Sequence, residues 1–267
     1  MNVSIDGKGP VLVLSHALAL DRDMWSGIAA RLASNYTVVR YDHRGHGDET
    51  APLAPFDIDD LADDAAEVIR QASASPVVFV GLSLGGMVGQ ALAARHPALL
   101  RGLVVLNTAA HYPDRRTWDT RIQAVHKEGM AAVADASIER WLTPAFRQTS
   151  AGLESADRLR SSLLRTDPVA YTRTCEAIAR MDLRAGNRRI SVPTLVIAGN
   201  QDMATPPSMS RDLVKDIPNA CLIEVDAAHV SAAEIPEHIS TLLHEWMSTL
   251  DAHPPEGELV GNRPRAA

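Results

Sequence analysis

The chain has 267 residues, of which 46% are hydrophobic and 22% are charged, and its formal net charge is −7. This composition is typical of a globular protein with a sizeable core, and its acidic balance provides no basic surface for nucleic acid. No apolar run approaches the roughly 20 residues needed to span a bilayer, and the first residues lack the pattern of a signal peptide. The two cysteines, Cys175 and Cys221, indicate neither a disulfide framework nor a metal site. We therefore expect a cytoplasmic protein without nucleic-acid or membrane partners, and the sequence leaves its oligomeric state open.

Short apolar runs rich in β-branched residues recur along the chain and end at turn signals. They are Val11–Ser15, Tyr36–Tyr41, Val77–Gly81, Leu103–Asn107, Thr194–Ala198 and Cys221–Val225. Helical patterns lie between them, and these are Ile58–Ile69 behind a predicted N-cap at Asp57, Met87–Ala94, Pro206–Ile217 and Pro236–Leu250. Continuous apolar runs are typical of parallel strands buried on both faces, and the alternation implies right-handed crossovers. The sequence therefore predicts an α/β fold.

The alternation of strands and helices is interrupted between about Thr108 and Ile190. This stretch has helical patterns and no strand-like run, and it is too long for a loop. We interpret residues 108–190 as a helical cap, and residues 1–107 with 191–250 as the core. Residues 251–267 are rich in proline, glycine and charge, so we expect a disordered tail.

The segment Gly81-Leu82-Ser83-Leu84-Gly85 matches the G-x-S-x-G pattern between a predicted strand and a predicted helix. In such an elbow the small residues let the chain turn tightly, so that the serine is exposed at the carboxyl edge of the sheet. A glycine-rich packing turn is the structural alternative, and a phosphate-binding loop would require a lysine that is absent. The pattern predicts that Ser83 is a nucleophile.

A serine hydroxyl needs a base, and after such an elbow the acid and then the histidine follow later strands. His229 comes just after the last predicted strand, and Asp202 follows the strand before it. Asp226 is the competing acid, and we prefer Asp202. His43 and His46 have the spacing of a metal pair but no third ligand accompanies them.

The oxyanion formed on attack needs two backbone donors. The Leu84 N–H at the start of the helix is one, and the Leu18 N–H in the loop after Val11–Ser15 is the other. Ser15 itself has no predicted base or elbow, so we do not expect it to be a nucleophile.

Several stretches together carry a resemblance to a known family. They are Arg40–Gly47, Gly81–Gln90, Leu106–Ala110, Ala177–Asp182, Thr205–Pro207 and Ala227–Ser231. The chain resembles α/β-hydrolases and, among them, the 3-oxoadipate enol-lactonases of the β-ketoadipate pathway, which belongs to aromatic catabolism. The resemblance implies a mostly parallel central sheet flanked by helices, with the cap inserted after the sixth strand. It also implies a serine hydrolase that cleaves a small lactone or ester and needs no metal or cofactor.

The resemblance further implies a cation for the substrate's carboxylate. Arg121, Arg173 and Arg180 in the cap are candidates, and Trp118 and Trp141 are candidate lining residues. Solvated helix faces and core packing are the structural alternatives for these five side chains. The chain departs from the family in lacking a strand that usually precedes the region beginning at Asn2.

Other functions compete with enol-lactone hydrolysis. An esterase or lactonase for a different ester, such as a secondary metabolite, is the nearest alternative, and a cofactor-free perhydrolase is another. A non-catalytic small-ligand receptor is the alternative of a different class, although a complete set of Ser83, Asp202 and His229 argues against it. Epoxide hydrolases and haloalkane dehalogenases need an aspartate where Ser83 stands, and carbon–carbon bond hydrolases tend to have an aromatic residue where Val230 stands.

Overall fold

The computed structural model describes residues 1–50 and 54–252 of the chain. Within them the strands are β1 (Val3–Asp6), β2 (Val11–Ser15), β3 (Thr37–Tyr41), β4 (Val77–Leu82), β5 (Leu100–Leu106), β6 (Thr194–Gly199) and β7 (Ala220–Val225). The α-helices are α1 (Ser26–Leu32), α2 (Ile58–Ala72), α3 (Leu84–Arg95), α4 (Arg116–Glu128), α5 (Ala131–Trp141), α6 (Ser150–Arg165), α7 (Pro168–Arg180), α8 (Arg184–Asn187), α9 (Pro207–Asp216), α10 (Ser231–Glu234) and α11 (Pro236–Ala252). Short 3₁₀ turns cover Arg22–Trp25, Pro97–Leu99 and Phe146–Gln148.

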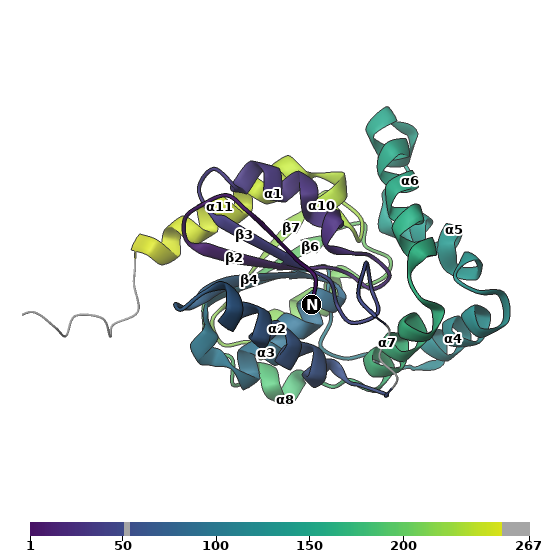
Figure 1. Cartoon of the computed structure of the whole chain (residues 1–267), viewed down its shortest axis with the longest axis horizontal. Coiled ribbons are helices and arrows are strands. Elements are labelled where there is room, and N and C mark those ends of the chain that lie inside the picture. Colours follow the sequence, from purple (N-terminus) through teal and green to yellow (C-terminus); the bar gives the residue numbers. More distant parts are fainter. Residues whose placement is uncertain (51–53, 253–267) are drawn as a thin grey trace, which may run out of the picture.

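The strands form one sheet in the order β1-β3-β2-β4-β5-β6-β7. Only β1 runs antiparallel to its neighbour among the described strands, and the other pairs are parallel. Helices α1, α10 and α11 lie on one face of the sheet, and α2 and α3 lie on the other, with α8 beyond α3 (Figure 1). The predicted α/β architecture is therefore confirmed. The sequence analysis did not identify β1 or α1, which are short.

The helices α2 and α3 show two ways in which the sequence specifies a helix. Asp57 caps α2 with a capping box, because its side chain accepts from the Asp60 N–H and Asp60 accepts in return. One face of α2 is buried, as its apolar spacing predicts. Helix α3 is buried all round from Leu84 to Ala93, because it lies between the sheet and α2.

A long helical segment, α4–α8, connects β5 to β6, and we call it the helical insertion. It follows the fifth described strand, which is the sixth when the extra strand expected for the family is counted. Helices α4–α7 lie beside the sheet layer, and α6 projects away from the rest (Figure 1). Helix α8 falls within the predicted cap boundaries but packs on α3, where Asn187 Nδ2 donates to Gln90 Oε1 at 2.9 Å. Apart from its first two residues, which end α11, the predicted tail lies outside the described residues.

The strand register brings the ends of distant strands to one edge of the sheet. Ser15 pairs with Gly81, Leu82 with Leu106, and Gly199 with Val225. The loops that leave these strands therefore start side by side, although they lie far apart in sequence. In open parallel sheets this carboxyl edge is where ligands bind.

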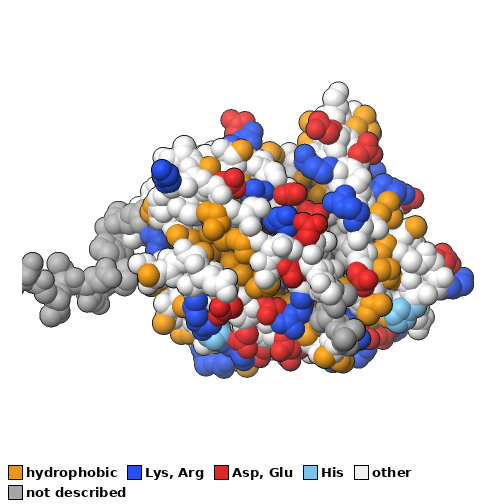
Figure 2. All heavy atoms as spheres, in the orientation of Figure 1, with side chains coloured by type: hydrophobic (Ala, Val, Ile, Leu, Met, Phe, Trp, Pro, Cys, Tyr) orange, Lys and Arg blue, Asp and Glu red, His pale blue; other side chains and the backbone are white. Residues whose placement is uncertain are grey.

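The surface is mixed in charge, and no described helix has the length and apolar character of a membrane span. Positive and negative side chains alternate over the face seen in Figure 2. At the base of α6, Arg165 pairs with Asp21 at 3.1 Å and so ties the insertion to the core.

Three histidines, His16, His43 and His46, form a buried cluster behind the loop that follows β2. The rings of His16 and His43 lie 4.4 Å apart, and those of His16 and His46 lie 5.4 Å apart. Burial lowers the pKa of His16 to about 4 and that of His46 to about 3, and burial with the neighbouring imidazoles lowers the pKa of His43 as well. The cluster is therefore neutral at neutral pH.

This cluster should make the protein less stable in mild acid. Unfolded histidines bind protons below about pH 6.5, whereas the folded ones stay neutral to about pH 4, so protons favour unfolding between these values. We expect the free energy of unfolding in urea to fall between pH 7 and pH 5. His46→Gln should reduce this fall, whereas His126→Gln on the exposed surface of α4 should not. An unfolding free energy that is equal at both pH values would contradict this prediction.

Candidate active site

Ser83 lies at the junction of β4 and α3 and adopts a strained backbone conformation. Its φ is 55° and its ψ is −111°, a combination of backbone angles that residues other than glycine rarely adopt. Its N–H donates to the Leu106 carbonyl at 2.9 Å, and its own carbonyl accepts from Thr108 Oγ1 at 2.7 Å. The neighbouring strand β5 and the loop after it therefore hold the strained residue.

The glycines of the elbow are required by close backbone contacts. A Cβ atom on Gly81 would lie 2.0 Å from the Gly85 carbonyl oxygen, and a Cβ on Gly85 would lie 2.2 Å from that of Ser15. Both distances are too short for non-bonded atoms, so any residue larger than glycine would force the backbone to move at either position. The pattern G-x-S-x-G thus follows from the tightness of this turn.

Asp202 and His229 lie in the loops after β6 and β7 and are hydrogen bonded to each other. His229 Nδ1 and Asp202 Oδ2 are 2.8 Å apart. The Ala204 and Thr205 N–H groups donate to Asp202 Oδ1 at 2.8 and 2.9 Å, and Thr205 Oγ1 donates to Oδ2 at 2.7 Å. The competing carboxylate, Asp226, instead accepts from Gln201 Nε2 at 2.8 Å.

The surroundings of Asp202 keep it ionised. Burial alone would raise its pKa, but the charge of His229 and the hydrogen bonds from His229 and Thr205 lower it to about 2. A carboxylate bound to Nδ1 keeps the proton on that nitrogen when the ring is neutral, which leaves Nε2 free to accept one.

Asn107 was not assigned a role from the sequence, although it holds this arrangement together. Its Nδ2 donates to Asp202 Oδ2 at 3.0 Å and to the Ala228 carbonyl at 3.3 Å, and its Oδ1 accepts from Ser231 Oγ at 2.7 Å. Its φ of 47° lies in the left-handed region, which asparagine tolerates better than most residues. The sequence signal that could have identified Asn107 is its position as a polar residue at the end of the apolar run Leu103–Asn107.

Two backbone N–H groups near Ser83 have no acceptor. Leu84 is the first residue of α3, so its N–H has no partner within the helix, and Leu18 lines the same cavity as Ser83. No hydrogen bond from either N–H to a described residue is found. Ala19, next to Leu18, has a φ of 63°, and its carbonyl accepts from Thr166 Oγ1 at 3.3 Å. The helical insertion therefore contacts the loop that contains Leu18.

Ser15 does have a histidine partner, contrary to the expectation from the sequence. Its Oγ lies 3.0 Å from His43 Nε2 and 2.9 Å from Tyr41 Oη. The spacing of strand residues gave no indication of this pair, because β3 brings His43 beside β2 only in the folded sheet. Ser15 is nevertheless fully buried and absent from the cavity lining, so a substrate has no access to it.

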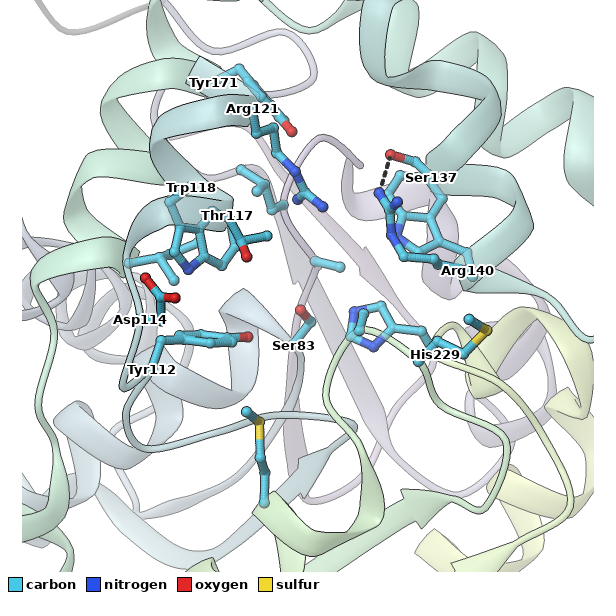
Figure 3. A pocket seen from close by; sticks show the side chains of 17 residues that line it. Ser83, Tyr112, Asp114, Thr117, Trp118, Arg121, Ser137, Arg140, Tyr171 and His229 are labelled. Atoms are coloured by element: carbon cyan, nitrogen blue, oxygen red, sulfur yellow. Dashed lines mark hydrogen bonds between the residues drawn. The ribbon is translucent and has the colours of Figure 1, made fainter. Parts of the chain in front are cut away.

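A cavity of about 320 Å³ lies over Ser83 and His229, and we call it the main cavity. Figure 3 shows both side chains at its base, with residues of α4, α5 and α7 opposite them. The lining residues are Ala17, Leu18, Ser83, Tyr112, Asp114, Thr117, Trp118, Arg121, Ser137, Arg140, Trp141, Tyr171, Ile178, Met203, Ala204, Met209 and His229. A chamber of this size accommodates a small organic molecule.

The structure places three of the five predicted binding residues in this lining. Trp118, Arg121 and Trp141 line the main cavity, whereas Arg173 and Arg180 do not. The reason is helical phase, because Tyr171 and Ile178 are the α7 residues that face the cavity. Arg173 and Arg180 each follow one of these residues by two positions, so their side chains point about 200° around the helix axis from the cavity. Arg180 instead donates to the Phe56 carbonyl at 3.3 Å.

Arg140 on α5 also lines the cavity and was missed. It lies one helical turn from Ser137, whose Oγ accepts from its Nη2 at 3.5 Å, and it is adjacent to Trp141. The predicted position of Trp141 was the signal that could have found it. Burial and the positive charge of Arg121 lower the pKa of Arg140.

The two arginines give the main cavity a positive region. The Arg121 guanidinium lies over the Trp118 ring at 5.1 Å. Neither Arg121 nor Arg140 forms an ion pair with a carboxylate of the described residues, and Asp114, which also lines the cavity, pairs with Arg116. Two half-buried cations without a counter-charge favour an anionic ligand.

The described residues contain no group of three histidine, cysteine or carboxylate side chains that could hold a metal ion. In the cluster of His16, His43 and His46, two of the ring nitrogens that a metal ion would need are already hydrogen bonded. His43 Nε2 bonds Ser15, and His16 Nε2 accepts from the His43 N–H at 2.9 Å.

Comparison with known proteins gives concordant results. The family model for the α/β-hydrolase fold matches residues 10–234. The chain is 34% identical to 3-oxoadipate enol-lactonase 2 of Acinetobacter baylyi over 228 residues, which cover 85% of each chain. It is 27% identical to a putative carbamate hydrolase of Pantoea ananatis, over 91% of this chain and 90% of that one. The crystal structure of the enol-lactonase from Burkholderia xenovorans superimposes with a TM-score of 0.88 at 35% identity, over 92% of this chain and 96% of that one. The chain belongs to the α/β-hydrolase fold family.

Proposed function

We propose that this protein is a carboxylic ester hydrolase that uses a Ser83-Asp202-His229 triad on a small anionic lactone or ester. The observation that carries the proposal is the arrangement at the base of the main cavity. Ser83 and His229 face one another there, and Asp202 is bonded to His229 Nδ1 at 2.8 Å (Figure 3). A buried carboxylate, an imidazole and a strained serine in this order are suited to nucleophilic acyl transfer.

In the proposed reaction, Ser83 Oγ attacks the carbonyl carbon of the substrate while His229 Nε2 accepts the hydroxyl proton. The Leu18 and Leu84 N–H groups donate to the oxyanion. Collapse of this intermediate breaks the bond between carbonyl carbon and leaving oxygen, and His229 returns the proton to that oxygen. A water deprotonated by His229 then attacks the acyl-enzyme, which releases the carboxylic acid and Ser83.

The substrate class follows from the walls of the cavity. Arg121 and Arg140 supply unpaired positive charge, and Trp118 and Trp141 supply apolar surface. A lactone that carries a carboxylate satisfies both, and the relatives named 3-oxoadipate enol-lactonase support that choice. With such a substrate the leaving oxygen is an enol, which becomes a ketone after ring opening. Relatives with other names, including esterases, make a different ester the alternative substrate.

Turnover of two substrates tests the proposal. We expect the protein to hydrolyse p-nitrophenyl acetate and freshly prepared 3-oxoadipate enol-lactone, and Ser83→Ala to lower both rates by about 10³-fold or more. Hydrolysis of the simple ester alone would retain the serine hydrolase and reject the enol-lactone. If wild type and Ser83→Ala were equally inactive on both, a ligand receptor would replace the enzyme.

Removal of Arg121 should separate anionic from neutral substrates. Loss of a charge-assisted hydrogen bond costs about 1.5–3 kcal/mol, so Arg121→Gln should lower kcat/KM for the anionic lactone by about 10- to 100-fold. The value for p-nitrophenyl acetate should change less than about twofold. Arg173→Gln, which removes the same charge from outside the main cavity, should change neither. Equal losses on both substrates after Arg121→Gln would indicate a structural role instead.

A further inference from the structure

A second cavity adjoins the main one, and we call it the outer cavity. Its volume is about 420 Å³, and it lies between the end of α5, the segment after it, and the loops that follow β6 and β7. It is lined by Ala136, Glu139, Arg140, Leu142, Thr143, Pro144, Arg147, Gln201, Met203 and Ala228. Arg140 and Met203 belong to the walls of both cavities. Only these two side chains are shared, so they separate the two spaces.

The partition between the cavities is built from adaptable side chains. Met203 is 72% exposed, and its unbranched thioether side chain has several rotatable bonds. Among the described residues, the Arg140 side chain forms one hydrogen bond, a long one of 3.5 Å from Nη2 to Ser137 Oγ.

The outer cavity has its own positive charge. Arg140 and Arg147 both line it, and neither forms an ion pair with a carboxylate of the described residues. The Nε atom of Arg147 is buried without a hydrogen-bond acceptor. The Arg147 guanidinium therefore has a donor from which no described residue accepts a hydrogen bond.

The carboxylates near the outer cavity leave this charge available. Glu139 lines it from the exposed side of α5, where solvent screens its charge. Glu234 lies behind the wall, and its oxygens accept from the Thr143 hydroxyl, the Thr143 N–H and the Ala228 N–H. Neither carboxylate is paired with Arg140 or Arg147.

We propose that the outer cavity is a second anion subsite, in which Arg140 and Arg147 bind one carboxylate of a dicarboxylic acid product. The proposal rests on the proposed function in one respect: hydrolysis of an ester that already bears a carboxylate produces a second one. The product therefore carries one more negative charge than the substrate, and this charge forms beside Ser83. Guanidinium groups form bidentate hydrogen bonds with carboxylates. Arg140 lines both cavities and can therefore contact a carboxylate in either of them. The outer cavity thus receives the product acid as it leaves the main cavity.

Calorimetric titration with two acids of equal length tests this subsite without any turnover. The probes are adipate, which has two carboxylates, and hexanoate, which has one. We expect Arg147→Gln to raise the Kd of adipate by about tenfold and to leave that of hexanoate unchanged. Arg147→Lys keeps the positive charge but loses the bidentate hydrogen bonding, so it should give an intermediate Kd for adipate. Arg31→Gln on α1 removes the same charge elsewhere and should change neither.

Three results would overturn the subsite. They are no binding of adipate to the wild type, an adipate Kd that is independent of residue 147, and equal weakening of both acids by Arg147→Gln. The rate on p-nitrophenyl acetate, measured in parallel, should be unchanged by Arg147→Gln because the main cavity is intact. If the wild type hydrolysed no ester but adipate binding still depended on Arg147, the proposed function would fail and the subsite would stand. If the wild type hydrolysed esters but adipate binding did not depend on Arg147, the subsite would fail and the proposed function would stand.

Discussion

The left-handed backbone of Ser83 is the constraint on which the rest of the site depends. A residue with a φ of 55° costs about 1–3 kcal/mol, so the surrounding structure must hold it in place. The Ser83 N–H donates to the Leu106 carbonyl, and Thr108 Oγ1 donates to the Ser83 carbonyl. Glycines at positions 81 and 85 allow β2, β4 and α3 to approach closely. The same turn places Leu84, the first residue of α3, directly after the serine. A tightly packed core therefore holds the Ser83 side chain in place at the base of the main cavity.

The parallel sheet brings the other groups to this hydroxyl. Strands β5, β6 and β7 end at one edge, and Asn107, Asp202 and His229 come from the loops that leave them. Asn107 bonds to the other two loops, through Asp202 and the Ala228 carbonyl, so that three separate segments behave as one unit. The helical insertion then closes the space above this edge and adds charge through Arg121 and Arg140. In the proposed function, the sheet edge supplies the reacting groups and the insertion supplies the charge that selects the substrate.

The sequence predicted the architecture well because strand, turn and helix signals are local. Elbow spacing and position after a strand were enough to select Ser83, Asp202 and His229, which the structure brings to one site, although their roles stay predictions. The insertion was harder, because apolar and basic residues occur on every face of its helices. The phase of α7 excludes Arg173 and Arg180 from the main cavity, and that of α5 includes Arg140. Long-range contacts such as those of Ser15 with His43 and of Asn107 with Asp202 depend on the folded sheet and leave no local pattern.

The central claim is that Ser83 forms a covalent acyl-enzyme. The most direct test is to mix the protein with p-nitrophenyl acetate, quench the reaction within the first turnover, and locate the added acetyl group by peptide mass spectrometry. We predict one acetyl group per chain on Ser83 of the wild type, and none at this position in Ser83→Ala. Acetyl groups on another residue, or turnover without any acyl-enzyme on Ser83, would contradict it.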